Sequence, residues 1–113
     1  SREPRMVFVD RPLVTLVLGD VVHNACRAAS SRVVLSASAW GRGVCFEVRD
    51  DGAGYPHEVL RASGGVLQSR GGVSSGLGLK LAASVAKAHR RGQQIGEIHL
   101  SNAPGACFRM QLP

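Results

Sequence analysis

The sequence is poor in aromatic residues and in cysteine, and it has no long apolar run. Aromatic side chains make up 4% of the 113 residues, and the three cysteines, Cys26, Cys45 and Cys107, form no CxxC pair. An odd number of widely spaced cysteines argues against a disulfide framework or a zinc site and fits a reducing, cytoplasmic setting. Asp20 interrupts the longest apolar stretch, well short of the ~20 residues of a membrane span.

Acidic residues are also scarce. The chain has eight acidic and fourteen basic residues, which gives a formal net charge of +6. Such an excess suits an anionic partner, such as nucleic acid, acidic lipid or a phosphate-rich ligand. The basic residues are dispersed, however, and Arg90-Arg91 is the only doublet. We therefore expect no nucleic-acid partner, because a nucleic-acid surface gathers its basic residues on one face or stripe.

The apolar residues that are present suffice for one compact core. They make up 44% of the chain, and the length fits a single domain over residues 1–113. Apolar positions from Val14 to Ala29 recur at three- and four-residue steps, which predicts a helix. Asp10 is its predicted N-cap, and Pro12 suits its first turn. Ser30-Ser31 is its predicted end.

The remaining elements follow from alternation, glycine and proline. Strands are predicted at 6–9, 33–39, 44–48, 95–100 and 106–112, and a short helix at 56–62. A second long helix is predicted over 77–91, with Gly92 as its stop; its apolar face would hold Leu77, Leu81, Val85 and Ala88. Helices on one side of a mixed, mainly antiparallel sheet give a two-layer α/β sandwich of the α+β class.

Polar residues line one face of the first helix. They stand at i, i+3, i+4 and i+7 and share one stripe; they are Asp20, His23, Asn24 and Arg27. Carboxylate and amide oxygens are ligands that Mg²⁺ takes alongside phosphate oxygens and water. A guanidinium pairs with phosphate through two parallel hydrogen bonds. Taken alone, the stripe equally fits an ordinary solvated helix face.

Two glycine-rich segments are the other candidates. The segment from Asp50 to Gly54, DDGAG, follows a strand; a buried carboxylate there would accept a hydrogen bond from a ligand amine. A plain Asp-Gly turn is the alternative. The segment from Gly76 to Leu79, GLGL, opens a helix, whose first N–H groups and positive dipole end attract phosphate. A glycine hinge without a ligand is the alternative there.

In this order and spacing, the three segments resemble one family. The chain, from about Phe8 to Pro113, is similar to the catalytic ATP-binding domain of two-component sensor histidine kinases. That domain shares its fold, the GHKL or Bergerat fold, with gyrase, Hsp90 and MutL-type ATPases. Residues 20–25 match the family's N box, 50–54 its first glycine box and 76–79 its second.

The resemblance implies an enzyme that binds ATP and Mg²⁺ and transfers the γ-phosphate to a histidine. That histidine would belong to a separate dimerisation domain, and a response regulator would act downstream. Asn24 would hold Mg²⁺ together with Asp20, and His23 and Arg27 would complete the catalytic group. The nucleotide-binding residues would be Asp50, which accepts the adenine amine, and Gly52, Gly54, Tyr55, Arg70, Gly76, Leu77, Gly78 and Leu79. Residues 63–75 would form the ATP lid.

Some positions depart from the family pattern. Asp20 replaces a common Asn, Ala28 stands where an aromatic residue is frequent, and Ala106 replaces a Thr or Ser. His23 occupies the position of the catalytic Glu of gyrase-type ATPases, which argues against efficient water activation. Two alternatives therefore stay open: an anti-sigma-type serine kinase on the same fold, and a degenerate module that binds nucleotide weakly or not at all.

The chain offers no phosphoacceptor of its own. His57-Glu58 resembles a phosphoacceptor pair, but it directly follows Gly54-Tyr55-Pro56, at the mouth of the expected nucleotide pocket, and is interpreted as structural. We expect the isolated domain to be monomeric, cytoplasmic and inactive without its phosphoacceptor domain, whether or not the parent receptor is anchored in a membrane.

Overall fold

The computed structural model describes residues 9–61, 75–102 and 104–113, and for residues 75–77 it describes the backbone alone. The helices and strands, in chain order, are α1 (Arg11–Ala28), β1 (Val33–Trp40), β2 (Gly43–Asp50), α2 (His57–Arg61), α3 (Ser75–Ala88), β3 (Arg90–Arg91), β4 (Gln94–Ile95), β5 (Glu97–Asn102) and β6 (Ala106–Leu112). None of the described helices is long and apolar enough to cross a membrane.

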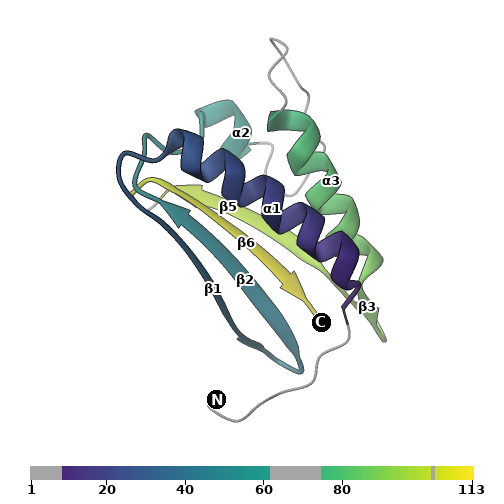
Figure 1. Cartoon of the computed structure of the whole chain (residues 1–113). Helices are drawn as coiled ribbons and strands as arrows, with labels where there is room; N and C mark the ends of the chain where they lie inside the picture. The colour runs from purple at the N-terminus through teal and green to yellow at the C-terminus, as the bar shows by residue number, and fades with distance from the viewer. Residues whose placement is uncertain (1–8, 62–74, 103) are drawn as a thin grey trace.

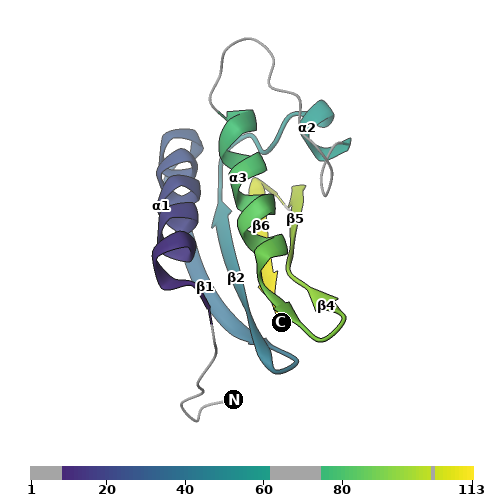
Figure 2. The ribbon, with the colours of Figure 1, turned by 90° about the vertical axis from the view of Figure 1, so that its right-hand side faces the viewer.

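Four strands form one sheet in the order β1-β2-β6-β5, and every described pair is antiparallel. Both long helices, α1 and α3, lie on the same face of this sheet (Figures 1 and 2). This arrangement confirms the predicted two-layer sandwich. Because β6 lies between β2 and β5, it joins the first hairpin to the last one.

The first helix begins and ends close to its predicted bounds. Asp10 is the N-cap, and its Oδ1 accepts a hydrogen bond from the backbone N–H of Leu13 at 3.1 Å. Pro12 lies in the first turn, where its missing N–H costs no hydrogen bond. The predicted strand at 6–9 falls outside the described residues except for Val9, which belongs to no strand.

The core lies between the helices and the sheet. Phe108, Met110 and Leu112 of β6 are fully buried, which confirms that they share one face. Val17 and Val21 of α1 are buried as well. Because these side chains repeat every second residue in the strand and every third or fourth in the helix, local periodicity places both faces correctly.

The second long helix differs from its prediction in length. It ends at Ala88, not at Arg91, because Arg90–Arg91 pairs with Gln94–Ile95 in a separate hairpin. Gly92, predicted to stop the helix, instead lies in that hairpin's turn with φ +61°. Ile95 accordingly belongs to β4 and not to the closing hairpin. Arginine favours a helix, so only the pairing with β4 ends the helix early.

The buried face of α3 also differs from the predicted one. Leu79, Ala82, Val85 and Ala86 are buried, whereas Leu81 is 41% exposed and Ala88 is exposed. Leucine and alanine occur on every side of this helix, so periodicity did not single out one face. Tertiary packing selects the side with Ala82 and Ala86, because α3 packs against both α1 and the sheet.

Candidate functional site

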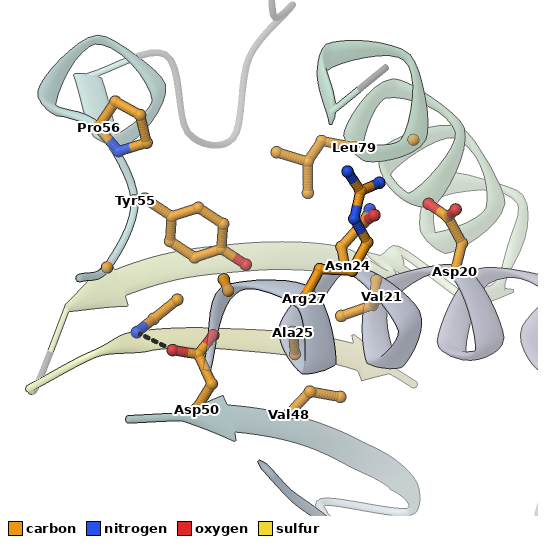
Figure 3. A pocket seen from close by; sticks show the side chains of 14 residues that line it. Asp20, Val21, Asn24, Ala25, Arg27, Val48, Asp50, Tyr55, Pro56 and Leu79 are labelled. Atoms are coloured by element: carbon orange, nitrogen blue, oxygen red, sulfur yellow. Dashed lines mark hydrogen bonds between the residues drawn. The ribbon is translucent and has the colours of Figure 1, made fainter. Parts of the chain in front are cut away.

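A cavity of about 370 Å³ opens between α1, the end of β2, the loop before α2 and the start of α3 (Figure 3). A smaller cavity, of about 280 Å³, lies between α3 and β5. Its lining residues are Asp20, Val21, Asn24, Ala25, Arg27, Ala28, Val48, Asp50, Gly54, Tyr55, Pro56, Gly78, Leu79 and Ala106.

The cavity brings together most of the predicted site residues that the structure describes. Those in its lining are Asp20, Asn24, Arg27, Asp50, Gly54, Tyr55, Gly78 and Leu79. Two predicted residues do not line it: His23 is exposed on α1, and Gly52 packs behind the cavity against the carbonyl oxygen of Ala28. Arg70 and the lid residues 63–74 lie outside the described residues, as do the side chains at 75–77.

Asp50 occupies the floor of the cavity at the end of β2. It is 8% exposed, and its Oδ1 accepts hydrogen bonds from the backbone N–H groups of Gly52 at 2.8 Å and Ala106 at 3.3 Å. Among the described residues no group donates to its Oδ2. The backbone therefore fixes the carboxylate through one oxygen and leaves the other to accept a hydrogen bond from a ligand.

Ala106 contributes to this site through its backbone. The sequence indicates only that Ala106 replaces a Thr or Ser. Its N–H, the first of β6, donates to Oδ1 of Asp50 and helps to orient that carboxylate. Every residue except proline supplies that N–H group. Replacing the usual Thr or Ser by Ala thus leaves this contact to Asp50 intact.

The polar stripe of α1 forms the opposite end of the cavity. Asp20, Asn24 and Arg27 all point to the side of the helix that faces the cavity (Figure 3). The Asp20 carboxylate lies against Gly78, where a Cβ atom would collide with its Oδ2. One carboxylate, one amide and one guanidinium thus stand near the start of α3, where oxygen ligands for a cation and a donor for an anion lie close together.

Tyr55 projects its ring into the cavity above Asp50 (Figure 3). Burial raises the pKa of its phenol well above the ordinary value, and the negative charge of Asp50 raises that pKa further. Its backbone N–H donates to Oδ1 of Asn102 at 2.8 Å, and the Asn102 amide donates back to its carbonyl at 3.1 Å. Sequence reasoning missed Asn102, because no spacing rule links residues 47 positions apart.

Asp51 is a second residue that the sequence reasoning missed. Its Oδ1 accepts hydrogen bonds from the backbone N–H groups of Ser30 and Ser31, both at 2.9 Å, and of Arg32 at 3.1 Å. The Ser31 hydroxyl donates to its Oδ2. These donors hold the pKa of Asp51 far below its ordinary value, with the Ser31 hydroxyl the largest cause. Asp51 therefore links the end of β2, next to Asp50, to the loop that follows α1. A cluster of polar residues at 30–32 is the only hint of this in the sequence.

The two ends of the cavity differ in character. Around Asp50 the lining is mostly apolar, with Val48, Ala25 and the Tyr55 ring; the other end carries the α1 stripe and the start of α3. An apolar slot with one hydrogen-bond acceptor suits a flat heterocycle that carries an amine. A helix start with cationic and oxygen side chains beside it suits a phosphate chain and a divalent cation.

Comparisons with known proteins find one matching family and similar folds. The family described as histidine kinase-, DNA gyrase B- and HSP90-like ATPase matches residues 9–113. The signal transduction histidine-protein kinase AfsQ2 of Streptomyces coelicolor is 34% identical over 115 residues, which cover 93% of this chain and 20% of that protein. The chain thus spans about one fifth of that relative's length.

Two solved structures share the fold. The catalytic domain of histidine kinase ThkA has a TM-score of 0.75 at 24% identity; the match covers 95% of this chain and 71% of that one. Full-length ShkA, solved in complex with AMPPNP, has a TM-score of 0.73 at 26% identity; the match covers 97% of this chain and 23% of that one.

Proposed function

The chain belongs to the histidine kinase-, DNA gyrase B- and HSP90-like ATPase family, and we propose that it binds ATP with Mg²⁺ and donates the γ-phosphate to a histidine. The acceptor would lie on a separate domain of the parent protein. The observation that carries this proposal is the convergence of Asp50, Asn24, Arg27 and the start of α3 on one cavity.

At the base end, Asp50 is the specificity group. Its Oδ2 would accept a hydrogen bond from the exocyclic amine of adenine, while the backbone keeps Oδ1 occupied. A carboxylate is a pure acceptor, so it favours the amine of adenine over the carbonyl oxygen that guanine carries at the corresponding ring position. The Tyr55 ring would lie against the base in the mostly apolar slot.

At the phosphate end, the residues present fit a magnesium nucleotide. Asn24 and Asp20 stand one helical turn apart and both line the cavity, so they would share one cation whose other ligands are phosphate oxygens and water. Bound Mg²⁺ supplies charge neutralisation for phosphoryl transfer. Arg27 would pair with the phosphates, and the first turn of α3 would present its N–H groups to them.

Phosphotransfer fits these residues better than hydrolysis by the chain alone. Among the described residues, the carboxylates that line the cavity are Asp20 and Asp50, and both have other roles in this proposal. His23, the residue in the position of a catalytic base, is exposed and does not line the cavity. Positioning of the γ-phosphate for an incoming acceptor is then the main contribution of this domain.

The acceptor side of the proposal rests on the relative. AfsQ2 is named as a signal transduction histidine-protein kinase and is 34% identical to this chain. We propose by analogy that the acceptor histidine belongs to a dimerisation domain, that a response regulator receives the phosphate, and that the domain works in the cytoplasm. Residues 63–75 would form the lid, and its Arg70 would contact the γ-phosphate; Arg70 lies outside the described residues.

The first test is a calorimetric titration of the chain with ATP, with and without Mg²⁺. Asp50→Asn keeps the side-chain shape but removes the charged acceptor, and should weaken ATP binding by about 10- to 100-fold, as expected for a hydrogen bond to a charged group. Glu58→Gln, on the exposed surface of α2, is the matched control for loss of a carboxylate. Equal ATP affinity in Asp50→Asn and wild type would contradict the adenine assignment.

The second test addresses phosphotransfer in the full-length parent kinase. Asn24→Ala should abolish Mg²⁺-dependent phosphorylation of the acceptor histidine while the circular dichroism spectrum stays unchanged. Phosphorylation of an added serine-bearing partner, with no histidine phosphate formed, would instead support the anti-sigma-type kinase. No ATP binding by the folded wild-type chain would support the degenerate module.

A further inference from the structure

Asn102, the last residue of β5, makes two reciprocal hydrogen bonds with one residue of the cavity. Its Oδ1 accepts from the Tyr55 N–H at 2.8 Å, and its Nδ2 donates to the Tyr55 carbonyl at 3.1 Å. The carboxamide thus pairs with the Tyr55 backbone as a neighbouring strand would. One side chain, 47 residues away, thus forms hydrogen bonds with both the backbone N–H and the carbonyl of Tyr55.

Gly54, beside Tyr55, shows how tightly this contact is built. Its φ is +90°, and a Cβ atom there would lie 2.7 Å from both Cγ and Oδ1 of Asn102. The Asn102 carboxamide therefore occupies the space that a side chain at Gly54 would take. The two hydrogen bonds and this close approach hold the backbone at Gly54 and Tyr55 against Asn102, and the Tyr55 ring points from there into the cavity (Figure 3).

The β5–β6 hairpin also holds Asp50, the other residue at the end of the cavity proposed to bind adenine. Asn102 pairs with Ala106 in the β5–β6 ladder, and the Ala106 N–H donates to Oδ1 of Asp50. The two paired residues at the end of this hairpin therefore hold Tyr55 and Asp50, respectively. A substitution that alters the backbone at Asn102 or Ala106 should therefore change how Tyr55 and Asp50 are placed.

We propose that Asn102 is a positioning residue for the nucleotide base, because it holds the Tyr55 backbone so that the ring lies across from the Asp50 carboxylate. This proposal rests on the proposed ATP-binding function for the identity of the ligand. Asn102 itself does not line the cavity. It acts through Tyr55, and its contribution is the preorganisation of the slot before the base enters.

A purely structural contact would have different consequences. Asn102 is exposed and lies outside the buried core cluster, so its loss removes no apolar packing. If it only stabilised the fold, a folded Asn102 variant would keep the wild-type Tyr55 environment and the wild-type ATP affinity. A positioning role predicts changes in both, measured on protein that is still folded.

The Tyr55 phenol gives a readout that needs no nucleotide. Tyr55 is the only tyrosine of the chain, so phenolate absorbance reports on it alone. In the wild type, burial and the Asp50 charge raise its pKa. In Asn102→Ala the ring should leave this environment, and its pKa should fall toward the ordinary value of about 10. The matched control is Ser101→Ala, the exposed neighbour on β5. An unchanged titration in folded Asn102→Ala overturns the proposal.

ATP affinity is the second readout. Asn102→Ala should raise the Kd for Mg-ATP by at most about 30-fold, the limit reached if ligand binding must replace the full net strength of two neutral hydrogen bonds. The Kd for inorganic triphosphate should stay unchanged. Asn102→Asp keeps the acceptor for the Tyr55 N–H but loses the donor, so it should fall between wild type and Asn102→Ala. If Asn102→Ala does not fold, the Tyr55 titration and the Kd for Mg-ATP are measured on Asn102→Asp. Normal ATP affinity in a folded variant overturns the role of Asn102, whereas no ATP binding by wild type overturns the proposed function itself.

Discussion

The Asp20 carboxylate lies directly against Gly78, so the two helices that frame the cavity touch at the place where α3 starts. This contact joins the N-box helix to the second glycine box, segments more than 50 residues apart in the chain. It also explains the glycine at this position by steric space, since any Cβ atom there would collide with Oδ2 of Asp20.

Gly78→Ala should therefore weaken ATP binding, because the Asp20 side chain must turn away from the added Cβ. Stability should change little, because alanine is the better helix former by about 1 kcal/mol. Urea unfolding and calorimetric titration would measure the two effects. Gly19→Ala is the matched control, because a Cβ at Gly19 of α1 meets no atom within 4 Å, and it should stabilise the chain. The double variant Asp20→Ala/Gly78→Ala should show the full helix preference of alanine at position 78, because it removes the atom that collides. Strictly additive effects of the two substitutions would contradict the contact.

Asp20→Asn should make nucleotide binding less dependent on Mg²⁺. The carboxylate repels phosphate in the absence of a cation and attracts the cation when it is present, so the neutral amide should bind metal-free ATP more tightly and Mg-ATP more weakly. Titrations with and without Mg²⁺ measure the two affinities on the same protein. An unchanged ratio between them would place Asp20 outside the phosphate site.

Asp51 should make stability depend on pH in acid. Its folded-state pKa is lowered, chiefly by the Ser31 hydroxyl and the backbone N–H groups of residues 30–32, so the unfolded chain binds a proton below about pH 4 that the folded chain resists. The stabilisation is complete above about pH 4 and is lost as the pH falls through the lower, folded-state pKa.

Asp51→Asn should be less stable than wild type at neutral pH and should lose less stability between neutral pH and strong acid. Urea unfolding at a series of pH values measures this difference, with Glu58→Gln as the control for removal of an exposed carboxylate. Parallel stability profiles for Asp51→Asn and wild type would show that these hydrogen bonds do not persist in solution.

The buried face of α3 can be tested by two neighbouring substitutions. Ala82 is fully buried, so Ala82→Leu should overpack the core around α3 and cost about 1–3 kcal/mol in the free energy of unfolding. Leu81 is 41% exposed, so Leu81→Gln should change stability much less. Thermal or urea unfolding compares the two variants. The reverse order would favour the face that periodicity alone predicted.

Much of the site was predictable from the sequence because its signals are local. The stripe of Asp20, Asn24 and Arg27 follows from helical spacing, and Asp50 lies where its motif ends a strand; the cavity includes all four. The two-layer fold followed in the same way, from apolar repeats of about 3.6 residues in the helices and 2 in the strands.

Other features became visible only once the chain was folded. Asp51 meets its backbone partners about 20 residues away, and Asn102 meets Tyr55 across 47 residues. Neither side chain forms a local pattern. The Asp51 contacts need β1 and β2 to pair, and the Asn102 contact needs β5 to join the same sheet through β6.

The sequence by itself determined which chemical groups the cavity contains, since motif residues keep their identity wherever the chain places them. The tertiary structure decided how those groups are held, which side of α3 is buried and where that helix ends. These outcomes depend on pairing and packing between distant segments, and the free energy of such contacts is not encoded in the periodicity of any one segment.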